Sequence, residues 1–201
     1  MINSVHIIHP YTYKIKGEEL IIGPVKEYSE RDKRIKNFAG KALKSGARVF
    51  HHADLPVQSM DGLIRNALFA LDPLFEWLRD SRIQIFTTTR YGMPIKDNKP
   101  DNLNTTDWEQ LKLYYTSSAD MKKLASKSDK TFFIGGVLEC CVSNAISHYQ
   151  DRIMGSSEEV FYVPELCVSL NPEKFKPLET KLSAFNIFAL SYKEAMLSMQ
   201  N

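Results

Sequence analysis

The sequence has few cysteines, little net charge and no long apolar run, and each of these absences excludes a class of protein. Three cysteines in 201 residues, two of them adjacent, do not make the disulfide framework of a small secreted domain. No apolar run approaches the roughly 20 residues that cross a bilayer. A net charge of +2 gives no electrostatic case for binding nucleic acid or an anionic membrane. Residues 1–13 also lack the pattern of a signal peptide, so we expect a cytosolic protein.

The composition is otherwise that of an ordinary globular domain. Hydrophobic residues make up 43% and charged residues 25% of the chain, and a chain of this length can bury a core without disulfides or metal. The longest basic cluster, Lys26 to Lys44, is interleaved with acidic residues, and we interpret it as the solvated face of a helix. Because there is no internal repeat, low-complexity tract or long linker, residues 1–201 are expected to form a single domain.

Short β-rich apolar runs alternate with stretches of helical spacing. Strands are predicted at residues 5–9, 48–52, 83–88, 131–134, 160–163 and 186–189. Helices are predicted at residues 30–45, 63–78, 107–125, 139–150, 173–183 and 192–199, with Gly46 ending the first of them and a loop at residues 91–104. This alternation favours a three-layer α/β/α fold, in which helices cover both faces of a mainly parallel six-stranded sheet.

The stretch from Thr131 to Tyr149, TFFIGGVLECCVSNAISHY, is the most informative about chemistry. A buried strand leads through Gly135-Gly136 into a helix with two cysteines in its first turn. At the carboxyl end of a parallel strand, a thiol at a helix N-terminus faces the ligand crevice. The helix dipole and free N–H groups there favour a thiolate and bind an oxyanion. The alternative is that the cysteines are small packing residues; we adopt it for Cys140 and leave both interpretations open for Cys141.

The segment GGVLECCVSNAI resembles the nucleophile segment of the isochorismatase-like and nicotinamidase-like cysteine hydrolases, through Gly136, Val137, Glu139, Cys141, Val142 and Ala145. The resemblance implies that Cys141 is the nucleophile and that the sheet has strand order 3-2-1-4-5-6. It further implies a non-proline cis peptide at Val137–Leu138 and an oxyanion hole formed by the backbone N–H groups of Leu138 and Cys141. Leu138 is bulkier than the Ala or Thr that is usual in the family.

The remainder of the chain resembles the same family less specifically. VHIIHPYTYKI fits the first strand, and VFYVPELC fits a later strand that ends at Glu165, Leu166 and Cys167. The catalytic Asp and Lys of the family are both replaced. His9 takes the Asp position, where a histidine would activate Cys141; the alternative is that His9-Pro10 only ends a strand, with a half-buried imidazole. Arg90 takes the Lys position with a permanent charge and a different geometry, and Lys96 and Lys112 are weaker candidates.

The metal-binding pattern of some family members, an Asp-x-His pair followed by a later His, is incomplete in this sequence. Asp54 is present, but Pro56 stands two residues later. His51 and His52 are neighbours on a predicted strand and so point to opposite faces. Because a divalent metal needs more ligands than Asp54 and one histidine, we expect neither a metal nor a cofactor.

Two functions of different classes remain open. The first is a cysteine hydrolase that acts on a small amide, ester or vinyl ether. The second is a catalytically silent relative that serves as a binding or assembly module. A nucleotide-binding domain is a third, weaker interpretation, since the sequence has no G-x-G-x-x-G or Walker loop. The partners expected are a small-molecule substrate or ligand and other copies of the chain in a homo-oligomer, with no nucleic acid and no membrane.

Overall fold

The structure, a computed structural model, describes residues 3–10, 13–16, 19–22, 26–54, 77–78, 80–88, 128–147, 158–169, 173 and 175–199. The strands are β1 (Asn3–Ile8), β2 (Tyr13–Lys16), β3 (Glu19–Ile22), β4 (Arg48–Asp54), β5 (Ile83–Thr88), β6 (Lys130–Gly136), β7 (Glu159–Val168) and β8 (Ile187–Ala189). The helices are the 3-10 turn η1 (Lys26–Tyr28), α1 (Ser29–Lys44), the π-helix η3 (Leu138–Val142), α6 (Phe175–Ser183) and α7 (Tyr192–Ser198).

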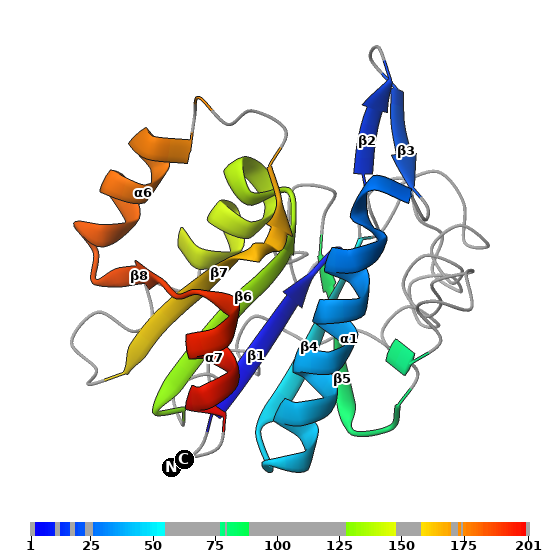
Figure 1. Cartoon of the computed structure of the whole chain (residues 1–201), viewed down its shortest axis with the longest axis vertical. Coiled ribbons are helices and arrows are strands. Elements are labelled where there is room, and N and C mark those ends of the chain that lie inside the picture. Colours follow the sequence, from blue (N-terminus) through cyan, green and yellow to red (C-terminus); the bar gives the residue numbers. More distant parts are fainter. Residues whose placement is uncertain are drawn as a thin grey trace, which may run out of the picture.

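Six of the strands form one sheet in the order β5-β4-β1-β6-β7-β8, and every neighbouring pair is parallel. In terms of the six predicted strands this is the order 3-2-1-4-5-6, so the predicted topology is confirmed. Because all six strands are parallel, their carboxyl ends lie along one edge of the sheet. A separate antiparallel hairpin, β2–β3, was not predicted and rises beyond the carboxyl end of β1 (Figure 1).

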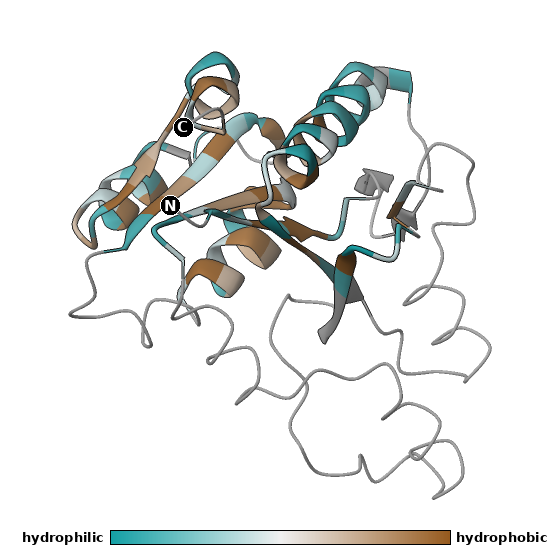
Figure 2. Cartoon of the chain, turned by 90° about the horizontal axis from the view of Figure 1, so that it is seen from below, coloured by the Kyte–Doolittle hydropathy of each residue, from teal (hydrophilic) through white to brown (hydrophobic). Residues whose placement is uncertain are grey.

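Helices cover both faces of the sheet, and each face has its own hydrophobic cluster. On one face, α1 and α7 pack over every second residue of the central strands, including Val5 and Ile7 of β1 and Phe132 and Ile134 of β6. On the other face, η3 and α6 pack over Ile8, Phe133, Val160 and Tyr162. Figure 2 shows the sheet between α1 and α7 on one side and the helical segment after β6 on the other. The three-layer fold class is therefore confirmed.

Helix α1 follows the predicted apolar spacing, with Ile35, Phe38, Ala39 and Ala42 all buried. It ends at Lys44, and Gly46 follows with a φ of 80°, as expected for a glycine after a helix C-cap. The interpretation of Lys26 to Lys44 as a solvated face is wrong in the first turn. There, Arg31 and Asp32 are 7% and 6% exposed. Arg31 precedes Ile35 by four residues, which places it on the buried stripe of the helix.

Strand β7 is longer than predicted, because it continues through Pro164 and Glu165 to Val168. The register of its pairing with β6 shifts between Phe133 and Gly135, and this irregularity lets pairing resume at Gly135 with Cys167. The helix predicted at 107–125 and the loop at 91–104 lie outside the described residues, as does the helix at 63–78 except for 77–78. Within the described part of the chain, no helix has the length and apolar character needed to cross a bilayer.

Candidate functional site

The candidate site lies where the carboxyl ends of β1, β6 and β7 meet. Ile8 pairs with Gly135, and Gly135 pairs in turn with Cys167. His9 follows β1 directly, and Cys141 lies in η3, which follows β6 after one intervening residue. His9 and Cys141 therefore lie at the same end of the sheet, as an activation of Cys141 by His9 requires.

Gly135 permits the close approach of β6 to β1 at this edge. Its φ is +117°, and a Cβ atom built on it would lie 1.9 Å from the carbonyl oxygen of Ile8. Only glycine avoids both the steric overlap and the unfavourable backbone conformation. Because Gly135 has no side chain, the two strand ends that precede His9 and the cysteine segment can lie close together.

The backbone between β6 and η3 contains a non-proline cis peptide, as expected from the resemblance, but at Gly136–Val137. The expected position, Val137–Leu138, is therefore wrong by one residue. Strand β6 continues through Gly136, and η3 already begins at Leu138, so the chain turns immediately after the strand. The Val137 carbonyl then accepts hydrogen bonds from the N–H groups of Cys140 and Val142, both at 3.1 Å. The bond from Val142 spans five residues and makes this first turn a π-turn, a feature often found at functional sites.

Cys141 is the fourth residue of η3 and is 7% exposed. It belongs to the cluster on the η3 face of the sheet together with Ile8, Leu138 and Val142. Leu138 is itself 1% exposed, which accounts for a bulky apolar residue at this position. Cys140 is more accessible than Cys141 and packs against both clusters. The roles of the Leu138 and Cys141 N–H groups as an oxyanion hole stay a prediction.

His9 is fully buried, so the half-buried imidazole expected in the alternative interpretation is wrong, while the choice between a base and a residue that only ends a strand stays open. The backbone N–H of His9 donates to the backbone carbonyl of His52 at 3.2 Å, and this bond anchors the turn after β1 to β4. Burial, reinforced by the nearby His51, lowers the pKa of His9 to about 3. The imidazole is therefore neutral at pH 7 and available to accept a proton, although its basicity is lower than that of an exposed histidine. Its φ of 40° lies in the left-handed region, which non-glycine residues rarely adopt outside strained or functional positions.

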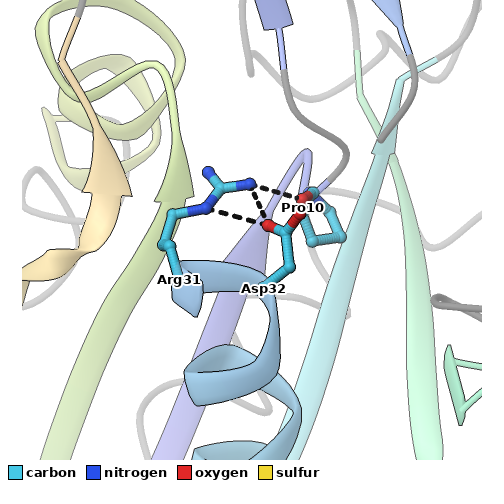
Figure 3. Close-up of polar contacts among 3 residues, drawn as sticks. All are labelled: Pro10, Arg31 and Asp32. Atoms are coloured by element: carbon cyan, nitrogen blue, oxygen red, sulfur yellow. Dashed lines mark hydrogen bonds and ion pairs between the residues drawn. The ribbon is translucent and has the colours of Figure 1, made fainter. Parts of the chain in front are cut away.

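Arg31 is a charged residue of the site that the sequence analysis did not identify. It reaches from the first turn of α1 to the carbonyl of Pro10, to which Nη2 donates at 3.0 Å, and it forms an ion pair with Asp32 (Figure 3). A Cβ atom built on Gly136 would lie 3.6 Å from Nη1, so the guanidinium also approaches the end of β6. The sequence signal was its place four residues before Ile35, on the buried stripe of α1.

Two further groups surround the end of β7. The Ser169 hydroxyl donates to the Glu139 carboxylate, which links the segment after β7 to η3. Burial raises the pKa of the Cys167 thiol to about 12, and the positive charge of Arg31 acts in the opposite direction. Cys167 therefore stays protonated at pH 7.

The two histidines considered for a metal are neighbours on β4. His52 Nε2 lies 2.8 Å from Nδ1 of His6, whose ring is stacked on Phe133 and lies tilted against Phe50. His51 is buried and one residue away on the same strand, so its side chain projects to the opposite face. Across the described residues, no group of three His, Cys, Asp or Glu side chains is placed to hold a metal ion. That the His51–Asp54 stretch binds no metal stays a prediction.

Three residues considered as a catalytic cation, namely Arg90, Lys96 and Lys112, lie outside the described residues. Strand β5 ends at Thr88 on the same edge of the sheet as His9 and η3. The assignment of Arg90 to the position of the family's lysine stays a prediction.

Neither a family model nor a curated protein sequence matches the chain. Solved structures match its fold over nearly its whole length. An isochorismatase-like hydrolase from Alkaliphilus metalliredigens has a TM-score of 0.59 at 10% identity, with 98% of this chain and 99% of that chain covered. A pyrazinamidase/nicotinamidase from Streptococcus mutans has a TM-score of 0.60 at 15% identity, covering 94% and 99%. An N-carbamoylsarcosine amidase from Thermoplasma acidophilum has a TM-score of 0.56 at 12% identity, covering 96% and 97%. The chain thus has the α/β fold of the isochorismatase-like hydrolases and related amidases.

Proposed function

We propose that this chain is a divergent isochorismatase-like cysteine hydrolase that acts on a small amide, ester or vinyl ether with Cys141 as nucleophile. The observation that carries the proposal is the joint placement of His9 and the π-turn with Cys141 at the carboxyl edge of β1 and β6, directly after a non-proline cis peptide. In parallel α/β sheets this edge is where ligands bind. The proposal further assigns the oxyanion hole to the N–H groups of Leu138 and Cys141.

For an amide or ester substrate, the neutral His9 imidazole takes the proton of the Cys141 thiol as the sulfur attacks the carbonyl carbon. The carbon–sulfur bond forms, the carbonyl oxygen becomes an oxyanion, and the backbone N–H groups stabilise it. The bond to the leaving amine or alcohol then breaks, and the imidazolium returns its proton to that group. Water, deprotonated by His9, next attacks the thioester and releases the acid together with the Cys141 thiol. Arg90 is assigned to support the negative charges.

The second candidate is a silent relative that binds a ligand without turning it over. Two observations favour it: the low pKa of His9, about 3, makes it a weak base, and Cys141 is 7% exposed. The two candidates differ in one measurable property, because a hydrolase needs a Cys141 thiol that ionises readily and a binding module does not.

Alkylation by iodoacetamide near neutral pH, mapped by mass spectrometry of the three cysteine peptides, measures this property. We expect Cys141 to react faster than Cys140 and Cys167 even though Cys140 is more accessible, because reactivity follows thiolate content. A panel of small amides, esters and vinyl ethers should then yield a substrate whose turnover disappears in Cys141→Ala and survives in Cys140→Ala. An inert panel, together with Cys141 reacting no faster than a free cysteine, would establish the silent relative.

A further inference from the structure

The turn after β1 is held on both sides of His9. On the amino side, the backbone N–H of His9 donates to the backbone carbonyl of His52 on β4 at 3.2 Å. On the carboxyl side, Arg31 Nη2 donates to the Pro10 carbonyl at 3.0 Å. Between these two anchors His9 has a φ of 40°. A non-glycine residue in this conformation costs on the order of 1–3 kcal/mol and persists only where its surroundings impose it.

The Arg31 anchor is rigid because the guanidinium is itself fixed. Nε donates to Asp32 Oδ1 at 2.9 Å, and Nη2 is shared between Asp32 and the Pro10 carbonyl. The side chains of Arg31 and Asp32 are 6% and 5% exposed, so water competes little for these bonds. A planar fork with several donors can satisfy a carboxylate and a carbonyl together, whereas the single ammonium of a lysine has no such fixed geometry.

The same guanidinium borders the segment that leads to Cys141. Its Nη1 lies 3.6 Å from the place that a Cβ atom of Gly136 would occupy, and its charge acts on the Cys167 thiol at the end of β7. One side chain of α1 therefore contacts the segment after β1 and approaches the end of β6, as Figure 3 illustrates for its bonds to Pro10 and Asp32. The distance between the His9 turn and the nucleophile segment is thereby tied to α1.

We infer that Arg31 is a positioning residue, which holds the His9–Pro10 turn in its left-handed conformation and so fixes the His9 imidazole relative to the Cys141 segment. The fixed conformation follows from the hydrogen bonds alone. Its catalytic consequence, that Cys141 depends on Arg31 through His9, rests on the proposed function. Without the fork, residue 9 relaxes towards ordinary backbone angles, and its imidazole moves away from the position that serves the thiol.

The test compares Arg31→Lys with Arg34→Lys. Arg34 lies on the same helix in a more exposed ion pair with Glu30, at 3.5 Å, and controls for loss of a guanidinium as such. If Arg31→Lys fails to fold, the double variant Arg31→Gln/Asp32→Asn replaces it, because it leaves no buried carboxylate unpaired. Imidazole resonances in 15N–1H NMR spectra, with His9 assigned from His9→Gln, report the ring position directly. Alkylation of Cys141 as a function of pH reports the catalytic consequence.

We expect the His9 resonances to move in Arg31→Lys and to stay in place in Arg34→Lys. The Cys141 alkylation rate should fall about tenfold to a hundredfold in Arg31→Lys, since small misplacements of a catalytic group cost that much. Adding Arg31→Lys to His9→Gln should lower the rate no further.

Unmoved His9 resonances would overturn the inference whatever Cys141 does. Moved resonances with an unchanged, fast Cys141 would overturn its catalytic part. A Cys141 that is slow already in the unaltered protein would overturn the proposed function instead, and the NMR comparison would still decide the position of His9.

Discussion

Gly135 and Gly40 show how one residue type is required in one place and replaceable in another. Gly135 has a φ of +117°, and its Cβ position overlaps the Ile8 carbonyl. Gly40 lies inside α1, and nothing lies within 4 Å of the place its Cβ would take. The first glycine is fixed by the approach of two strands, and the second contributes only backbone freedom.

We predict that Gly135→Ala destabilises the protein by at least about 2 kcal/mol, since it combines backbone strain with displacement of β1 from β6. Gly40→Ala should instead stabilise by about 0.5–1 kcal/mol, the helix preference of alanine over glycine. Urea unfolding followed by far-UV circular dichroism measures both. Equal midpoints for the two variants would contradict the geometry at Gly135.

At His9, the proposed chemistry makes the replacements unequal. His9→Ala should reduce kcat/KM at least about a hundredfold, the contribution typical of a general base. His9→Asp restores the residue type that the resemblance implies for this position and should retain more activity than His9→Ala. Steady-state kinetics on a substrate from the panel give the ratio. Equal activity of His9→Ala and the unaltered protein would remove His9 from the mechanism and leave Cys141 to be activated by another group.

The residues of the candidate site differ in how far the sequence revealed them. Cys141 became a candidate because a strand, two glycines and a helix start are contiguous in the chain, and the resemblance then assigned it as the nucleophile. His9 was found through the resemblance. Arg31 was missed because its function depends on the Pro10 carbonyl, a contact across 21 residues that no local pattern records. The cis peptide, which was predicted from the resemblance, was placed one residue too late.

Among the elements, those with strong periodicity were predicted well. Strand β5 has the predicted bounds, and α1, α7 and β8 agree with the predictions within about one residue. Strand β7 was predicted too short from its local apolar run at residues 160–163, whereas its pairing with β6 continues to Val168. The β2–β3 hairpin escaped prediction because its two strands of four residues give too short a pattern to distinguish.

Helix α7 has seven residues and depends on its ends for stability. Ser191 and Glu194 form a capping box at its start. At its end, Lys41 Nζ donates to the Met196 carbonyl at 2.6 Å, and Asn3 Nδ2 donates to the Ser198 carbonyl at 3.4 Å. These bonds join the C-terminal helix to α1 and to the first strand of the sheet.

We predict that Ser191→Ala lowers the free energy of unfolding by about 1 kcal/mol, whereas Ser191→Gly lowers it by only a few tenths, because glycine is tolerated at an N-cap. Thermal unfolding followed by circular dichroism distinguishes the two variants. If both variants lost the same stability, the hydrogen bonds of the serine side chain would not be what stabilises the start of α7.

Across the whole molecule, buried histidines connect the sheet to its stability in acid. Four of the five histidines, His6, His9, His51 and His52, are at most 2% exposed, and all lie on β1 or β4 or directly after β1. The His6 ring is stacked 4.9 Å from Phe133 and lies 4.8 Å from Phe50. Burial lowers the pKa of His6, His9 and His51 from 6.5 to about 3. The centre of the sheet is therefore built around neutral imidazoles.

The direction of the pH effect follows from where the protons bind. Below pH 6.5 the unfolded chain protonates these three histidines, while the folded chain does not until pH falls to about 3. Stability is therefore full above pH 6.5 and decreases through the window from 6.5 to 3, by up to about 1.4 kcal/mol per pH unit for each histidine. The Asp80 carboxyl, whose pKa is lowered from 3.8 to about 2 by its hydrogen bonds with Arg82, adds to this loss only below about pH 3.8. Free energies of unfolding are typically about 5–15 kcal/mol, and the loss summed over three histidines reaches this size within the window. We therefore expect acid unfolding well above pH 3.

Urea unfolding at pH 7.5, 6.5, 5.5 and 4.5 measures this directly, because the slope of the free energy of unfolding against pH gives the number of protons taken up. We expect more than one proton per chain between pH 5.5 and 4.5. His51→Gln removes one of the buried imidazoles, so its slope should be smaller by up to one proton whatever its stability at pH 7.5. A free energy that stays constant from pH 7.5 to 4.5 would mean that these imidazoles accept protons in the folded state. His9 would then be a stronger base than its burial implies, and the hydrolase would gain support over the silent relative from a measurement that involves no substrate.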